Sequence, residues 1–225
     1  MPETLSDRSS CKSTRQAILD AAGELFARKG LGGTGIREIV KEAGTSLSSV
    51  NYHFTNKEGL YLACLRHIMD EKLDLPGLFG ILDSGTYSTL QQVSDAMGYM
   101  MHRCLRALLG PGVPGWYGTL MVRSRMELHP KSSRALMRLE EPQKLRHFVR
   151  DHVPGLSEAF VQYWYINVMA QLQYYILERE AVLIAFDLTQ YDEAFLNGTA
   201  CYMAESMTQI LGLPVPDHRA VARRL

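Results

Sequence analysis

Apolar residues recur every three or four positions along almost the whole chain, and no segment shows a convincing alternation of apolar and polar residues. The first spacing places side chains on one face of an α-helix, whereas alternation is typical of a half-buried β-strand. The hydrophobic pattern therefore predicts an all-α protein.

A short helix followed by a glycine is expected near the start of the chain. This helix covers about residues 14–29 and ends at Gly30. Glycine suits a helix end because it adopts a positive φ angle at little cost. Thr34 then offers the side-chain oxygen that is typical of a helix N-cap, so a second helix is expected directly after it.

Two further helices are expected beyond this pair. Gly44 stops the second helix, and a helix of only about two turns begins at Ser46 or Leu47. Asn56 is a typical N-cap for the fourth helix, which reaches about Lys72. The first three helices are expected to close into a compact bundle, and the fourth leads out of it.

Longer and more apolar helices follow an interruption at Leu75-Pro76-Gly77. We expect them over about residues 88–109, 116–128, 132–152, 157–180 and 189–211. We therefore expect a disordered tail over residues 1–13 and a three-helix domain with its connecting helix over residues 14–72. A larger helical domain is expected over residues 73–213, and a C-terminal tail over residues 214–225.

Composition narrows the class of protein only slightly. With 46% hydrophobic and 21% charged residues, the 225-residue chain has the composition of a globular protein with a substantial core. Its formal net charge is zero, so the total charge neither favours nor excludes nucleic acid. Basic residues do exceed acidic ones between Lys12 and Arg66, which mildly favours nucleic-acid binding by this part of the chain.

Several kinds of chemistry are not expected. The four cysteines lie far apart and form no CxxC pair, which indicates reduced thiols rather than a disulfide framework or a metal site. The chain also lacks HExxH, a glycine-rich phosphate loop and a nucleophile elbow, so we expect no enzyme activity, no cofactor and no metal. The polar N-terminus and the lack of a long apolar run predict a cytoplasmic protein without a membrane segment.

The turn at Gly44 and the short helix after it carry the candidate chemistry. A helix-turn-helix needs a sharp turn, and its second helix needs a polar outer side to lie in the major groove of DNA, which is about 12 Å wide. Ser48 and Ser49 can point outward from this helix while Val50 and Phe54 pack inward. A helical hairpin of any α-protein could show the same turn, so periodicity alone leaves DNA binding open.

The residues themselves add a resemblance over positions 14–62. The segments TRQAILDAAGELFARKG, TGIREIVKEAGTS and VNYHFTNKEGLY resemble the N-terminal domain of TetR/AcrR-type transcriptional regulators. Asn51-Tyr52-His53-Phe54, together with residues 125–130, looks like the CerR-like subgroup, which has asparagine where the family usually has tyrosine. The resemblance implies an N-terminal helix-turn-helix DNA-binding domain and a larger helical domain for ligand binding and dimerisation.

The resemblance also implies which residues contact double-stranded DNA. The family's base-reading positions correspond to Leu47, Ser48 and Ser49, with Arg37 able to reach a base or a phosphate. Its phosphate contacts correspond to Thr34, Asn51, Tyr52, His53 and Lys57. For each residue the alternative is an ordinary structural role, either as a solvated surface side chain or, for His53, as a packing histidine.

A homodimer is implied by the resemblance, with two heads about 34–36 Å apart on a pseudo-palindromic operator. The two strongly apolar helices near the C-terminus are an independent reason to expect it. The expected interface comprises Val161, Trp164, Tyr165, Val168, Leu172, Met203, Met207 and Ile210. The alternative is that these residues complete the core of one chain.

The resemblance further implies a pocket for an unknown small-molecule effector between about residues 88 and 180. Methionine and aromatic side chains suit an adaptable apolar cavity, although each one taken singly is more often ordinary core. The expected lining is Met97, Met100, Met101, Trp116, Tyr117, Met121, Arg123, Arg125, Tyr163 and Tyr174.

The predicted function is a ligand-responsive regulator, a repressor that leaves its operator when the effector binds. The alternative is a DNA-binding regulator or architectural protein that responds to a protein partner or takes no ligand.

Overall fold

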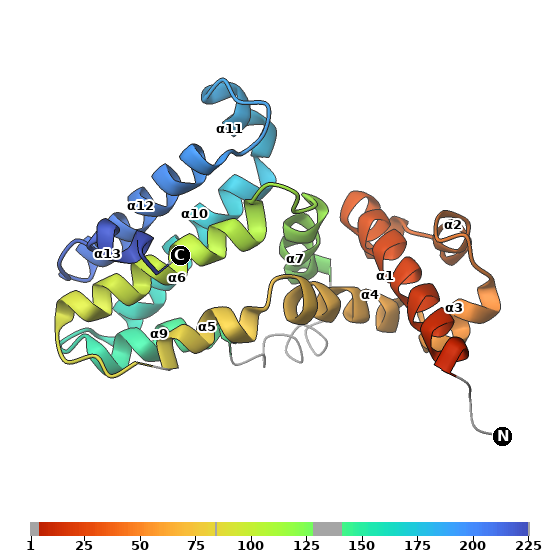
Figure 1. Cartoon of the computed structure of the whole chain (residues 1–225), viewed down its shortest axis with the longest axis horizontal. Helices are drawn as coiled ribbons and strands as arrows, with labels where there is room; N and C mark the ends of the chain where they lie inside the picture. Colours follow the sequence, from red (N-terminus) through yellow and green to blue (C-terminus); the bar gives the residue numbers. More distant parts are fainter. Residues whose placement is uncertain (1–4, 84, 128–140, 225) are drawn as a thin grey trace. The chain divides into compact units, whose positions relative to one another are not determined.

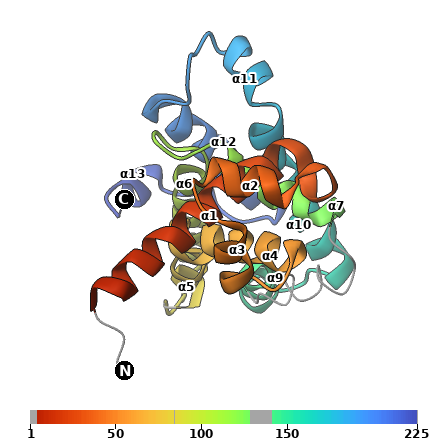
Figure 2. The same cartoon turned by 90° about the vertical axis from the view of Figure 1, so that its right-hand side faces the viewer.

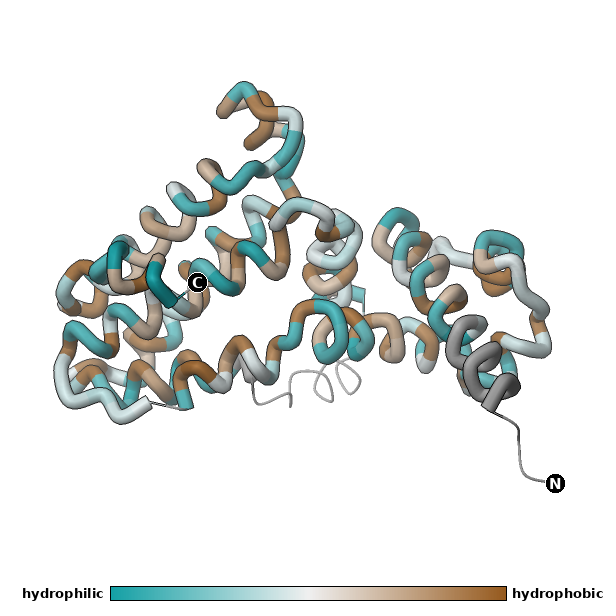
Figure 3. The backbone as a smooth tube through the Cα atoms, in the orientation of Figure 1, coloured by the Kyte–Doolittle hydropathy of each residue, from teal (hydrophilic) through white to brown (hydrophobic). Residues whose placement is uncertain are grey.

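The computed structural model describes residues 5–83, 85–127 and 141–224, and every regular element in these ranges is a helix (Figure 1). The prediction of an all-α protein is therefore confirmed. Hydrophobic and hydrophilic positions follow one another around the turns of the helices, as Figure 3 shows. The chain divides into two compact units, each with its own core.

The first unit combines the N-terminal helices with one helix from later in the chain. It is formed by α1 (Leu5–Gly33), α2 (Ile36–Glu42), α3 (Leu47–His53), α4 (Lys57–Arg66), the π-helix η1 (His67–Lys72) and α7 (Trp116–Glu127). α1 packs against α2, α3, α4 and α7. Its buried face includes Ile18 and Phe26, and the ring of Phe26 lies 4.9 Å from that of Tyr61 on α4.

The second unit is a helical bundle. It is formed by α5 (Leu75–Asp83), α6 (Leu90–Leu109), α9 (Glu141–His152), α10 (Glu158–Leu177), α11 (Arg179–Ala185), α12 (Glu193–Ile210) and α13 (His218–Ala222). α6 packs against α5, α12 and α13, and Figure 2 shows α13 beside α6. α9 contacts α5 and α10.

Several helix boundaries differ from those expected. α1 begins at Leu5, so helix extends into the region expected to be a tail. Its expected end at Gly30 is marked by a break, with φ of 77° at that residue. Leu75-Pro76-Gly77, expected as an interruption, begins α5, where proline is tolerated because the first N–H groups of a helix have no partner inside it. The first part of the helix expected over residues 132–152 lies outside the described residues.

The C-terminal segment is held on the second unit, although it was expected to be a tail. Asp217 caps α13 by accepting hydrogen bonds from the N–H groups of Arg219 and Ala220, at 2.9 and 3.2 Å. Val221 is buried, and the N–H of Asp217 donates to Asp95 on α6 at 2.8 Å. The short helix is therefore anchored by a cap, one apolar side chain and a hydrogen bond to α6.

Candidate nucleic-acid interface

A glycine makes the turn between α2 and α3, as predicted. Gly44 has φ of 58°, in the left-handed region. Its N–H donates to the carbonyl of Lys41 at 3.3 Å, and the N–H of Thr45 donates to that of Val40 at 3.1 Å. This pair of bonds is the Schellman motif, which satisfies the last carbonyls of α2 while the chain changes direction.

Three serines organise the start of α3. Ser46 is the N-cap, and its hydroxyl accepts a hydrogen bond from the N–H of Ser49 at 3.1 Å. The Ser46 hydroxyl also lies 2.7 Å from that of Ser48 and 2.9 Å from that of Ser49. Val50 and Phe54 are buried and fix the inner face of the helix against the unit. The polar side of α3 is therefore held at a defined orientation.

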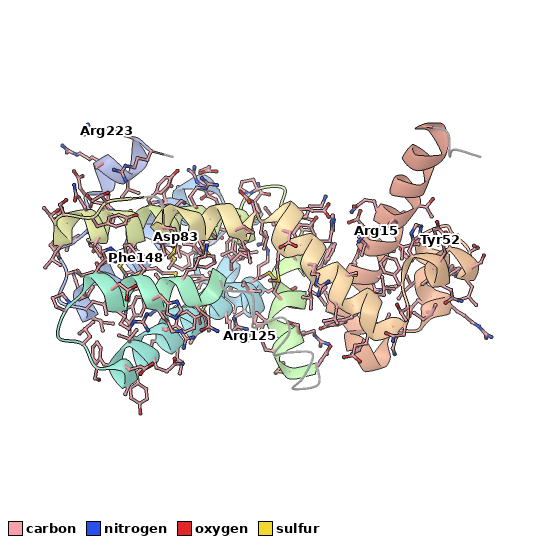
Figure 4. All side chains as sticks on the ribbon, turned by 90° about the horizontal axis from the view of Figure 1, so that it is seen from below. Arg15, Tyr52, Asp83, Arg125, Phe148 and Arg223 are labelled. Atoms are coloured by element: carbon pink, nitrogen blue, oxygen red, sulfur yellow. The ribbon has the colours of Figure 1, made fainter. Side chains whose placement is uncertain are left out.

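The outer face of this helix-turn-helix is open to solvent. Tyr52, which is labelled in Figure 4, is 77% exposed. Leu47 is 48% exposed although it is apolar. Ser48 and Asn51 are also exposed, as is Arg37 on α2, while Ser49 is half-buried. A short helix with one buried side and these polar residues on the other has the form that enters a major groove.

Thr34 has a different role from the one expected. The N-cap of α2 is Gly35, so the prediction that Thr34 caps this helix is wrong. The buried Thr34 hydroxyl points back to α1, where it lies 2.7 Å from the carbonyl oxygen of Gly30 and 3.2 Å from that of Leu25. With these two contacts the side chain of Thr34 closes the corner between α1 and α2.

Lys57 and His53 each contact other residues of the first unit. The ammonium group of Lys57 donates to the carbonyl of Thr34 at 3.2 Å. His53 is half-buried, with its ring centre 5.0 Å from that of Tyr52 and 6.0 Å from that of Phe54. Asn56 caps α4 as predicted, accepting from the N–H of Gly59 at 2.7 Å. Lys57 thus lies in the first turn of a capped helix, where an anion is favoured.

A carboxylate from α7 completes the first unit. Glu127 accepts hydrogen bonds from the N–H of Leu31 at 2.9 Å and from the hydroxyl of Tyr61 at 3.3 Å. Arg123, one turn earlier on α7, donates to the other oxygen at 3.0 Å. Burial, and then the charge of Glu127, raises the pKa of Tyr61. The i,i+4 spacing of Arg123 and Glu127 was visible in the sequence, but their partners were not.

The residues expected to line one pocket fall into both units. Trp116, Tyr117, Met121, Arg123 and Arg125 lie on α7 in the first unit. Met97, Met100 and Met101 are buried on α6 of the second unit, whereas Tyr163 and Tyr174 are exposed on α10. A surface pocket of about 300 Å³ in the second unit is lined by other residues, among them Ile81, Tyr87 and Tyr99.

Most residues of the expected dimer interface are buried within one chain. Val161, Trp164, Val168, Leu172, Met203 and Met207 are all buried, and Tyr165 is half-buried. The indole N–H of Trp164 donates to the carbonyl of Met207 at 2.8 Å, which ties α10 to α12. These side chains form the monomer core, the alternative that the sequence left open. Ile210 is exposed.

Several large apolar residues face solvent on α10 and α12. They are Phe160, Tyr163, Ile166, Tyr174 and Leu177 on α10, and Tyr202 and Ile210 on α12. Of these residues, the sequence placed only Ile210 in the expected interface. Both sides of α10 are apolar, so periodicity could not separate its inner side from its outer side. Among the helices of the described ranges, none has the length and apolar character needed to cross a membrane.

The geometry of α2, Gly44 and α3 defines a helix-turn-helix unit. Residues 18–64 match the family described as "Bacterial regulatory proteins, tetR family", so this unit contains a TetR-family N-terminal domain. RutR of Escherichia coli (strain K12), an HTH-type transcriptional regulator, is 43% identical over 56 residues. That match covers 25% of this chain and 26% of RutR, so the chain spans about a quarter of that relative's length.

Two comparisons extend over more of the chain. YttP of Bacillus subtilis (strain 168), whose name carries the same HTH-type designation, is 28% identical over 181 residues, or 72% of this chain and 84% of YttP. The crystal structure of AmtR from Mycobacterium smegmatis has a TM-score of 0.63 at 22% identity, and covers 93% of this chain and 90% of AmtR. At that identity the structural likeness concerns the all-α fold.

Proposed function

We propose that the protein is a transcriptional regulator that binds double-stranded DNA through α3. The observation that carries this proposal is the exposed polar face of α3, fixed behind by Val50 and Phe54 and placed by the turn at Gly44. Leu47, Ser48 and Ser49 read base edges, and Arg37 reaches a base or a phosphate. The TetR-family match over residues 18–64 supports this assignment.

Phosphate contacts come from Asn51, Tyr52, His53 and Lys57. Asn51 and Tyr52 are exposed on α3 itself, and Lys57 lies at the N-terminus of α4. For Lys57, the hydrogen bond to the Thr34 carbonyl positions the ammonium group without neutralising it, because a carbonyl carries no net charge. The hydroxyl of Thr34 is buried against α1, so Thr34 does not contact a phosphate with its side chain. It supports this surface through its carbonyl, which holds the ammonium group of Lys57.

A homodimer and an effector belong to the same proposal. The two heads bind half-sites about 34–36 Å apart, and the exposed apolar residues of α10 and α12 form the contact between two copies. A small molecule bound in the larger domain shifts the head spacing through α4 and releases the operator. Such a release requires the molecule to bind the two spacings of the heads with different affinity.

The segment Asn51-Tyr52-His53-Phe54 supports placing the chain in the CerR-like subgroup.

A test starts from an operator selected from random duplexes and measures binding by fluorescence anisotropy at several salt concentrations. Arg37→Ala and Ser49→Ala are expected to weaken binding and to relax base preference, each by about 1–3 kcal/mol where a base contact is lost. Lys57→Ala is expected to weaken binding to all sequences and to lower the salt slope by about one unit.

Thermal unfolding of each variant distinguishes lost DNA contacts from lost folding, since Lys57 also bonds within the unit. Glu42→Gln, an exposed change at the end of α2, is the control that should retain affinity. If all three variants bind like the parent, the reading helix is misassigned. If the dimer binds its operator but no small molecule alters the affinity, the ligand-independent alternative is favoured.

A further inference from the structure

Three potential metal ligands from distant parts of the sequence meet in the second unit. His102 on α6, Cys201 on α12 and His218 on α13 each offer one ligand atom, and these atoms lie within 4.8 Å of one another. The Cys201 sulfur is 3.8 Å from Nε2 of His102. In a tetrahedral zinc site, bonds of about 2.0–2.3 Å place ligand atoms about 3.4–3.6 Å apart. Small side-chain rotations therefore suffice to close the cluster on one ion.

A carboxylate orients one of the two imidazoles. Nε2 of His218 lies 2.8 Å from a carboxylate oxygen of Glu205, which is one turn from Cys201 on α12. When Nε2–H donates to this carboxylate, the lone pair stays on Nδ1. Nδ1 is buried and has no hydrogen-bond partner among the described residues. Metal-bound histidines typically donate their other ring N–H to a carboxylate, as His218 does here.

The second imidazole lies in the core of the second unit. His102 is buried, and its Nε2 lies 3.8 Å from the sulfur of Cys201. A metal ion binds the lone pair of a neutral imidazole. Arg106, one turn later on α6, directs its charge elsewhere, since its guanidinium lies 2.6 Å from Glu193 and 3.4 Å from Asn197. An ion near His102 therefore meets an arginine whose charge is already paired.

The three ligands stand on helices that are joined by other bonds. Ser94 on α6 donates to the carbonyl of Pro214 at 2.5 Å, and Gln91 donates to that of Val215 at 3.0 Å. These bonds hold the segment before α13 on α6, and α12 also packs against α6. Because the scaffold is already assembled, an ion orders only side chains on binding.

We propose that His102, Cys201 and His218 form a site for a divalent transition metal of the zinc type, with Glu205 as the carboxylate behind His218. One thiolate and two imidazoles suit a borderline-soft ion, whereas Mg²⁺ and Ca²⁺ prefer oxygen ligands. Three protein ligands leave a fourth position for water. On binding, the Cys201 thiol releases its proton to solvent, and the sulfur binds the ion as thiolate. The site lies within the second unit and does not depend on DNA binding.

The test is a titration of the chelator-treated full chain with Co²⁺, followed by absorbance. One equivalent of Co²⁺ is expected to give a thiolate-to-cobalt charge-transfer band, and Zn²⁺ is expected to displace it. Cys201→Ser removes the thiolate and is expected to abolish the band. His218→Gln, a change on the surface side of the site, is expected to weaken Co²⁺ binding by tenfold or more, as is Glu205→Gln through its effect on His218, by about 10–100-fold.

Cys104→Ala and His147→Gln are the matched controls, because each removes the same kind of group from the same unit but outside the cluster. Both are expected to retain the band, and circular dichroism without metal checks that each variant is folded. The proposal is overturned if the parent gives no thiolate band, if Cys201→Ser retains it, or if Cys104→Ala loses it as completely as Cys201→Ser. If Cys201→Ser does not fold, the affinity of His218→Gln for Co²⁺ is the deciding measurement. An affinity equal to that of the parent overturns the proposed site.

Discussion

The side chain of Glu127 caps a break in the backbone of α1: its carboxylate accepts the N–H of Leu31 at 2.9 Å. Gly30, with φ of 77°, interrupts α1 one residue earlier, so the N–H of Leu31 needs an acceptor from elsewhere. The same carboxylate oxygen accepts the hydroxyl of Tyr61 on α4. A single side chain of α7 thus joins the first helix of the unit to the fourth.

Removing this carboxylate should destabilise the first unit. Glu127→Ala leaves the Leu31 N–H and the Tyr61 hydroxyl without their acceptor, so the free energy of unfolding should fall by about 1–3 kcal/mol. Glu127→Gln keeps an acceptor oxygen and should cost less. Urea denaturation followed by circular dichroism measures both, with Arg125→Ala, an exposed change on the same helix, expected to stay within about 0.5 kcal/mol of the parent. Equal stability of Glu127→Ala and the parent would contradict the capping role.

A close approach between α1 and α7 should make Gly23 intolerant of substitution. A Cβ at this position would lie 2.4 Å from the ring of Trp116, so the indole must move. Gly23→Ala is expected to lower the unfolding free energy by about 1–3 kcal/mol, despite the better helix propensity of alanine. Gly80→Ala in α5, where the new Cβ meets nothing within 4 Å, is the control and should be neutral or stabilising.

A double-mutant cycle checks the cause of that effect. In a Trp116→Leu background the clash is relieved, so Gly23→Ala should cost less than in the parent. If the cost is unchanged, the indole is not the obstacle.

The left-handed turn at Gly44 should resist residues with a Cβ. Its φ of 58° costs an L-residue roughly 1–2 kcal/mol, so Gly44→Ala should lower the unfolding free energy by about that amount. Gly44→Asn should cost less, because asparagine visits this region more readily. The control is Gly32→Ala, where φ is not in the left-handed region and a Cβ meets nothing within 4 Å. A stable Gly44→Ala protein with unchanged operator affinity would contradict the need for this turn.

The exposed apolar residues of α10 and α12 should control self-association. Ile166→Glu and Tyr202→Glu each place a charge where the proposed dimer buries an apolar side chain, so each should raise the dimer dissociation constant at least about tenfold. Sedimentation equilibrium over a range of concentrations measures this. Met126→Glu changes a side chain that is 77% exposed on α7 of the other unit and should leave the constant unchanged. A dimer unaffected by both α10 and α12 changes would place the interface elsewhere.

Helices and their caps were the part of the fold that the sequence could predict. Gly44, Ser46 and Asn56 stand where expected, because capping and turn preferences depend on a few adjacent residues. Thr34 shows the limit of such local rules, since Gly35 rather than Thr34 is the N-cap of α2, and the Thr34 hydroxyl bonds back to carbonyls of α1. The sides of α10 could not be assigned either, because both carry apolar residues.

The sequence by itself therefore determined the all-α class, the helix-turn-helix and the exposed position of Ser48, all of which follow from residues close together in the chain. Only the tertiary structure brought Glu127 to Leu31 and gathered His102, Cys201 and His218, which the sequence had indicated to be free of metal. The physical reason is that a hydrogen bond or a coordination site requires atoms to meet within a few ångströms. Neither periodicity nor spacing encodes that meeting for residues about a hundred positions apart.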